Sequence, residues 1–206
     1  MKVTKAQVQA NRARIVETAS TLFRERGYDG VGVADLMAAA GFTHGGFYKH
    51  FGSKADLMAE SAACGFSQTV AMTESSDLAA FVQQYLSRQH RDAPGQGCTM
   101  AALCADAARQ PKPVREVFAT GLERLLAALT PDDAGDAAMS REMRAKYLDA
   151  IAHAVGALVL SRACPDDSPL ADEILETCRS VIQSNLPALP ELVPGGFVPD
   201  SRAPMG

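Results

Sequence analysis

The sequence lacks the segments that would direct a chain into or across a membrane. No apolar run approaches the roughly 18 residues that a membrane-spanning helix needs. The first residues, Met-Lys-Val-Thr-Lys-Ala-Gln, contain no apolar stretch of the kind that forms a signal peptide. We therefore expect no membrane partner and a cytoplasmic location.

The sequence also lacks paired cysteines. Its five cysteines are Cys64, Cys98, Cys104, Cys164 and Cys178, an odd number with no C-x-x-C spacing. A disulfide framework and a zinc site are therefore not expected, and most of these residues are interpreted as small core side chains. We expect no metal and no cofactor.

A recognisable catalytic constellation is missing as well. No Ser/His/Asp order, carboxylate pair or metal-ligand spacing occurs, and only His90 and His153 lie outside the N-terminal third. The chain is therefore interpreted as a non-enzyme. An all-α enzyme without a familiar motif remains the alternative from another class.

Charge is unevenly distributed along the chain. The net charge is −4, yet residues 1–54 carry eight Lys/Arg against four Asp/Glu, and the remainder is net −8. A basic N-terminal third followed by an acidic remainder is typical of a DNA-binding protein with a separate regulatory domain. Chance asymmetry is the alternative. A nonspecific DNA-packaging protein is disfavoured, because it would need a cationic surface throughout.

The apolar pattern is helical nearly throughout, and no stretch shows the period-2 alternation of a strand. Ile15, Ala19, Leu22 and Phe23, for example, share one helix face. We predict an all-α fold of about nine helices, with Gly27, Gly41 and Gly52 ending the first three. The predicted helices are 5–26, 33–40, 44–51, 54–69, 77–89, 98–109, 114–129, 140–163 and 171–186.

Two domains are predicted from this pattern. Residues 1–54 form a three-helix helix-turn-helix domain, and a helix over about 54–72 links it to a larger bundle over 73–206. The last twenty residues are rich in proline and glycine, so they are predicted to form a strap or a frayed tail.

The most informative segment is GFTHGGFYKHFGSKADL, residues 41–57. Phe47 and Phe51 are four residues apart and share a face that must be buried. Gly45 and Gly46 each cost a helix about 1 kcal/mol relative to alanine. Such a cost suggests that the helix backbone approaches something closely, and the DNA major groove is a natural candidate. Tyr48, Lys49, His50 and Lys54 can donate hydrogen bonds to phosphate oxygens. The alternative is a small three-helix core with solvated charges.

From Ile15 to Leu57 the sequence resembles the DNA-binding domain of the TetR family of repressors. The resemblance rests on "TASTLFRERGYDG", on "VADLMAAAGFTHGGFYKHFGSKADL", and above all on Phe47-Tyr48-Lys49-His50-Phe51. It implies that His44, Gly45 and Gly46 approach bases, and that Thr43, Tyr48, His50 and Lys54 grip phosphates. Gly32 departs from the usual Ser or Thr before the second helix, which puts a phosphate contact there in doubt.

The same resemblance implies a repressor that binds a palindromic operator as a homodimer. The helices 141–163 and 171–186 would form a four-helix interface with their symmetry mates. Ala154 and Gly156 would permit close approach, although an intramolecular core is the alternative. The predicted interface stripe is Leu148, Ile151, Ala152, Val155, Gly156 and Val159, with Leu158 beside it.

The resemblance also implies that a small-molecule effector binds between the helices of the body. The candidate lining is mainly apolar, which predicts an apolar or amphipathic ligand, although each side chain could equally be core. The candidates are Phe81, Tyr85, Cys98, Met100, Leu103, Cys104, Phe118, Leu122, Met143, Tyr147 and His153.

The segment from Gly97 to Leu103 resembles a subset of the family that includes sensors of reactive electrophiles. Cys98 is predicted to lie at a helix N-terminus, where a thiolate is favoured. A thiol switch at Cys98 is therefore an alternative on the same scaffold. The competing interpretation is that Cys98 merely fills a gap at the start of a helix.

Overall fold

The computed structural model describes residues 4–74, 78–129 and 140–185. These residues form nine α-helices and two short 3-10 helices and contain no strand, as predicted for the fold class. None of the helices in these ranges is long and apolar enough to cross a membrane. The predicted C-terminal strap over 187–206 lies outside the described residues. The elements are α1 (Lys5–Arg26), α2 (Val33–Ala39), η1 (His44–Lys49), α3 (Lys54–Glu74), α4 (Leu78–Tyr85), α5 (Arg88–Asp92), η2 (Pro94–Gln96), α6 (Thr99–Ala107), α7 (Lys112–Ala128), α8 (Arg141–Ala163) and α9 (Pro169–Asn185).

Glycines follow the first two helices as predicted, whereas η1 ends at Lys49 with His50 as its C-cap, before the predicted Gly52. Gly27 ends α1 with φ 72°, and Gly41 makes the turn after α2 with φ 82°. Both are left-handed conformations that glycine adopts without a steric penalty. Gly32 stands at the N-cap of α2, and Ser53 caps α3 by accepting a hydrogen bond from the Asp56 N–H at 3.2 Å.

Two predicted helices differ from the structure. The helix expected over 44–51 is the shorter 3-10 helix η1, because two glycines weaken its first turn and Thr43 makes no side-chain capping bond. The single helix expected over 77–89 breaks into α4 and α5. Ser87 adopts an extended conformation there and accepts a hydrogen bond from the His90 N–H at 3.2 Å, so it starts a new helix.

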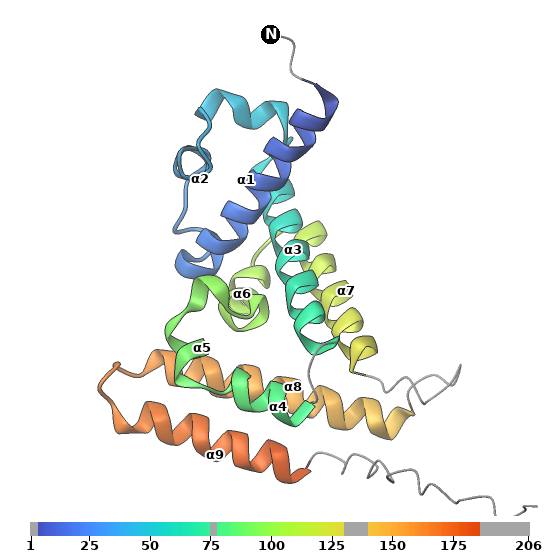
Figure 1. Cartoon of the computed structure of the whole chain (residues 1–206), viewed down its shortest axis with the longest axis vertical. Helices are drawn as coiled ribbons and strands as arrows, with labels where there is room; N and C mark the ends of the chain where they lie inside the picture. The colour runs from blue at the N-terminus through green and yellow to red at the C-terminus, as the bar shows by residue number, and fades with distance from the viewer. Residues whose placement is uncertain (1–3, 75–77, 130–139, 186–206) are drawn as a thin grey trace, which may run out of the picture.

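The helices form a head and a body (Figure 1). We call α1, α2 and η1 the head, which lies at one end of the molecule. The long helices α3 and α7 pack together through the middle, and α4, α8 and α9 lie across the opposite end. Gly121 of α7 allows this close packing, because a Cβ there would overlap the ring of Phe66 on α3.

Two apolar clusters hold these parts together. The first lies in the head around Phe23, Leu36 and Phe47, and the second lies in the body around Phe66, Leu86 and Leu158. The head cluster also includes Leu103 of α6 and Val114 of α7. The head is therefore packed directly onto the body. A displacement of α6 can be transmitted to the head through this packing.

Candidate functional site

The helix η1 presents a polar face to solvent. Thr43, His44, Gly45, Tyr48 and Lys49 are exposed, and the Tyr48 side chain is 70% exposed. This face is therefore available to a ligand as large as a DNA groove.

The two glycines of η1 have different surroundings. A Cβ at Gly46 would meet the Met37 Cε at 3.5 Å, which is ordinary contact, whereas a Cβ at Gly45 would meet nothing within 4 Å. Neither glycine has a positive φ. The fold itself therefore does not require glycine at position 45. A steric demand at this position must come from outside the protomer.

The opposite face of η1 is packed against the head. Phe47 and Phe51 are buried with ring centroids 5.5 Å apart, as their spacing predicts. The Arg12 guanidinium stacks over the Phe51 ring at 4.6 Å and pairs with Glu60. This pair ties α1 to α3, so the exposed face of η1 rests on a rigid base.

Two of the predicted phosphate donors point partly inward. The Lys54 ammonium donates to the Tyr28 carbonyl oxygen at 2.6 Å, which leaves two of its three protons for another acceptor. The His50 Nδ1 is buried without a hydrogen-bond partner in the described structure. Tyr48 and Lys49 are thus the most accessible donors on η1.

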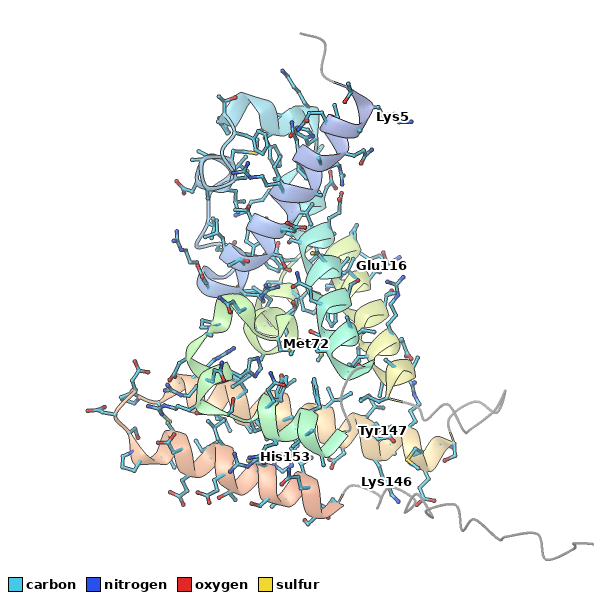
Figure 2. All side chains as sticks on the ribbon, viewed as in Figure 1. Lys5, Met72, Glu116, Lys146, Tyr147 and His153 are labelled. Carbon is cyan, nitrogen blue, oxygen red and sulfur yellow. The ribbon has the colours of Figure 1, made fainter. Side chains whose placement is uncertain are left out.

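A cavity of about 180 Å³ lies in the body between α3, α4, α5 and the loop before α6. It lies beside the end of α3 that carries Met72 (Figure 2). Its described lining combines aromatic, thioether, amide and hydroxyl groups and includes no Lys, Arg, Asp or Glu. The lining residues are Gly65, Gln68, Thr69, Met72, Phe81, Gln84, Tyr85, Ser87, Gln89, His90, Ala93, Gln96, Gly97 and Cys98.

His90 fixes one wall of this cavity. Its Nε2 accepts a hydrogen bond from the Cys98 N–H at 3.1 Å, so its Nδ1 carries the proton and donates to the Tyr85 carbonyl oxygen at 2.7 Å. Burial lowers the His90 pKa, and the nearby Arg162 cation lowers it further. The ring is therefore neutral at neutral pH and clamps α4 to the start of α6.

Tyr85 contributes an unusual group to the same wall. The residue is 8% exposed, and no oxygen or nitrogen of the described residues hydrogen-bonds to its hydroxyl. Burial raises its pKa well above the ordinary value, with the neighbouring Cys98 as the next cause. The hydroxyl is thus a protonated donor beside the cavity, and a thiol is only a weak partner for it.

The loop that closes this cavity is held to the head. Arg24, in the last turn of α1, donates from Nε and Nη2 to the Gly95 carbonyl oxygen at 3.0 and 2.7 Å. On the other side, Arg162 of α8 donates to the carbonyl oxygens of His90 and Arg91 at 2.8 and 3.0 Å. A displacement of η2 therefore pulls directly on α1.

Comparisons with known proteins agree with this architecture. Residues 15–60 match the family model described as "Bacterial regulatory proteins, tetR family". The HTH-type transcriptional regulator TtgR of Pseudomonas putida is 42% identical over 55 residues, which are 27% of this chain and 26% of TtgR. This N-terminal segment of the chain is therefore similar to TetR-family regulators.

Over most of its length, the chain also resembles solved structures in fold. The reduced form of E. coli NemR superposes with a TM-score of 0.70 at 19% identity, over 87% of this chain and 100% of NemR. AibR, in complex with isovaleryl coenzyme A and operator DNA, gives 0.52 at 17% identity, over 84% of this chain and 97% of AibR. The chain spans only about a quarter of the length of the curated relatives it matches.

The structure brings three of the predicted effector residues together. Phe81, Tyr85 and Cys98 line the 180 Å³ cavity. Met100 and Tyr147 are buried elsewhere in the body, and Phe118, Leu122 and Met143 are partly buried. Leu103 belongs to the head cluster, and Cys104 is exposed.

His153 lies on α8 away from that cavity (Figure 2). It lines a separate space of about 50 Å³ between α8 and α9, together with Lys146 and Asp149. This space is too small for an organic effector, since a cavity of about 150 Å³ is needed to hold benzene.

Much of the predicted interface stripe lies on the surface of α8. Leu148 and Val159 are 37% and 45% exposed, and Ala152 is exposed between them. Ile151 and Val155 are partly buried and also pack against the body cluster, while Leu158 is buried. A Cβ at Gly156 would meet nothing within 4 Å.

The sequence analysis missed the polar part of the cavity. Gly65, Gln68, Thr69 and Met72 occur at helical spacing i, i+3, i+4 and i+7 on α3, so they share one face. That spacing alone could have identified a semi-polar stripe on a linking helix. Gln96 and Gly97 lie in the loop before α6, for which the pattern of apolar residues gives no indication.

Proposed function

We propose that this chain is a TetR-family DNA-binding transcriptional regulator, acting as a homodimeric repressor that a small-molecule effector releases from a palindromic operator. The observation that carries the proposal is the exposed face of η1. It combines open space at Gly45 with exposed donors at Tyr48 and Lys49, on a base of buried phenylalanines. A helix with these features fits a major groove, where phosphate contacts position it and base contacts specify it.

The exposed apolar residues of the body support the homodimer. Leu148, Val159 and Leu160 on α8, and Leu170 and Val181 on α9, are between 37% and 59% exposed. A monomeric protein rarely leaves so many large apolar side chains exposed on two adjacent helices. Two heads related by a two-fold axis would read half-sites about 34–36 Å apart.

The contact between Arg24 and Gly95 supports release by an effector. An occupant of the cavity would press on the loop that carries Gly95, because Ala93, Gln96 and Gly97 line the cavity on either side of it. Arg24 would then shift with its carbonyl acceptor and move α1. We propose that this shift moves the two heads out of register with the operator.

The proposal is tested by DNase protection on the DNA upstream of the gene. We expect protection of one short palindromic site, and about a tenfold loss of affinity for Tyr48→Ala, since a lost hydrogen bond to a charged group costs about 1.5 kcal/mol or more. Tyr48→Phe serves as the matched comparison. Because it removes only the hydroxyl, its affinity shows how much of the loss comes from the hydrogen bond. Protection of all DNA would indicate a packaging protein. Absence of any protection would contradict the proposal and leave the enzyme alternative.

A thiol-based sensor is the second candidate, favoured by the position of Cys98. Cys98 lines the cavity at the N-cap of α6, and the guanidinium groups of Arg24 and Arg162 interact electrostatically with it. A helix N-terminus and nearby cations both promote the reaction of a thiol with electrophiles. The sulfur would add to a quinone ring carbon, and the thiol proton would end on a quinone oxygen, so no further oxidant is needed.

We expect p-benzoquinone to release DNA from the wild-type protein but not from Cys98→Ser. The measurement is fluorescence anisotropy of labelled operator before and after treatment. Cys164→Ser is the control and should respond like the wild type, since Cys164 lies at the end of α8 and does not line the cavity. Full release from Cys98→Ser would reject the thiol switch.

A further inference from the structure

The chemistry of the 180 Å³ cavity narrows the class of effector beyond what the regulator function implies. Its volume is close to the roughly 150 Å³ that holds benzene in an engineered cavity. The occupant is therefore about the size of one substituted ring. Larger, multi-ring compounds would require the cavity walls to move apart.

The electrostatic character of the cavity argues against a charged ligand. Among the described residues that line it, no side chain carries a formal charge that could pair with an anion or a cation. His90 is neutral, because its Nε2 accepts from the Cys98 N–H and its Nδ1 donates to the Tyr85 carbonyl. The guanidinium groups of Arg24 and Arg162 lie near the cavity, but they already donate to backbone carbonyl oxygens. A charged ligand would therefore lose its hydration here without gaining a close partner of opposite charge among the lining side chains.

The Tyr85 hydroxyl determines which functional group the ligand must carry. It is a buried donor on the cavity wall, and no described oxygen or nitrogen accepts from it. A buried hydroxyl whose only neighbouring partner is the weakly bonding Cys98 thiol is poorly satisfied, which destabilises the state that contains it. A ligand oxygen that accepts from this hydroxyl would remove the destabilisation. The ring of Phe81, 5.7 Å from that of Tyr85, offers an apolar surface for the rest of the molecule.

We propose that the cavity binds a small uncharged molecule with one ring, held by a carbonyl oxygen that accepts a hydrogen bond from the Tyr85 hydroxyl. The inference rests on the proposed regulator function, since it names the effector class of that regulator. The expectation of an apolar or amphipathic ligand is thereby narrowed to an uncharged single-ring carbonyl compound. Binding is noncovalent and does not depend on the Cys98 sulfur.

The test is isothermal titration of the full-length protein with three probes of similar shape. Acetophenone has a neutral carbonyl, ethylbenzene lacks the oxygen, and benzoate carries a charge. We expect acetophenone to bind at least tenfold more tightly than either of the others. Tyr85→Phe should lower acetophenone affinity about tenfold and leave ethylbenzene unchanged. Tyr147→Phe, at a buried tyrosine on α8 outside the cavity, should keep the wild-type preference.

Several results would overturn the inference. Benzoate binding as tightly as acetophenone would reject the uncharged class, and equal acetophenone affinity in the wild type and Tyr85→Phe would reject the hydrogen bond. Absence of binding by any probe would reject the cavity as a site for single-ring ligands. DNA affinity without a probe is measured in parallel. A protein that binds acetophenone but no DNA would contradict the proposed regulator function while supporting this inference.

Discussion

Gly156→Arg is expected to convert the proposed dimer into a folded monomer. Within the protomer a Cβ at Gly156 would meet nothing within 4 Å, so the substitution creates no internal clash. Replacing glycine inside α8 also favours the helix by up to about 1 kcal/mol. In the proposed interface, however, the same side chain would insert a bulky charge between closely packed helices. Light scattering should then give 21.8 kDa, the mass of one chain, and not twice that value.

Loss of the dimer should weaken operator binding more than any single contact does. A lone head binds one half-site and loses the effective concentration that links the two heads, a change of roughly 100-fold or more. Ala119→Arg, at an exposed position on α7, is the matched control and should leave mass and affinity unchanged. A Gly156→Arg protein that remains dimeric and binds with full affinity would place the interface elsewhere.

The fold was predictable where local chemistry decides it. Gly27 and Gly41 end or turn the chain because only glycine takes positive φ freely, and Ser53 caps α3 through its own hydroxyl. The break at Ser87 was missed, because the apolar spacing continues across it and only the serine cap interrupts the helix. The 3-10 form of η1 was missed although its glycines were recognised as weak helix formers.

The site was predictable only in part, because its parts depend on contacts between distant segments. Phe47, Phe51 and the exposed donors of η1 follow from helical spacing alone. The bond from Arg24 to the Gly95 carbonyl spans 71 residues, and the clamp between His90 and Cys98 depends on a loop folding back. No periodicity encodes such contacts. The inward orientation of Lys54 could not be predicted either. Its acceptor is the backbone carbonyl of Tyr28, and every residue type has such a carbonyl.

Substitution of Gly45 is expected to separate folding from DNA binding. Gly45→Ala should raise or preserve the melting temperature, because glycine costs a helix about 1 kcal/mol and the protein leaves open space there. Gly45→Leu should also fold. If η1 lies against the groove, however, each added side chain occupies space that the DNA needs. We expect a several-fold loss of operator affinity for alanine and about 30-fold or more for leucine, which corresponds to about 2 kcal/mol.

Thermal melting and anisotropy titrations on the same samples check this prediction for Gly45. Ala119→Leu adds similar volume at an exposed position on α7 and should change neither quantity. Full affinity in Gly45→Leu would show that the face of η1 does not approach DNA. A lowered melting temperature in Gly45→Ala would instead mean that the glycine serves the fold. The expected combination, unchanged stability with lost affinity, has one physical origin: the protomer leaves space at this position that only an external ligand fills.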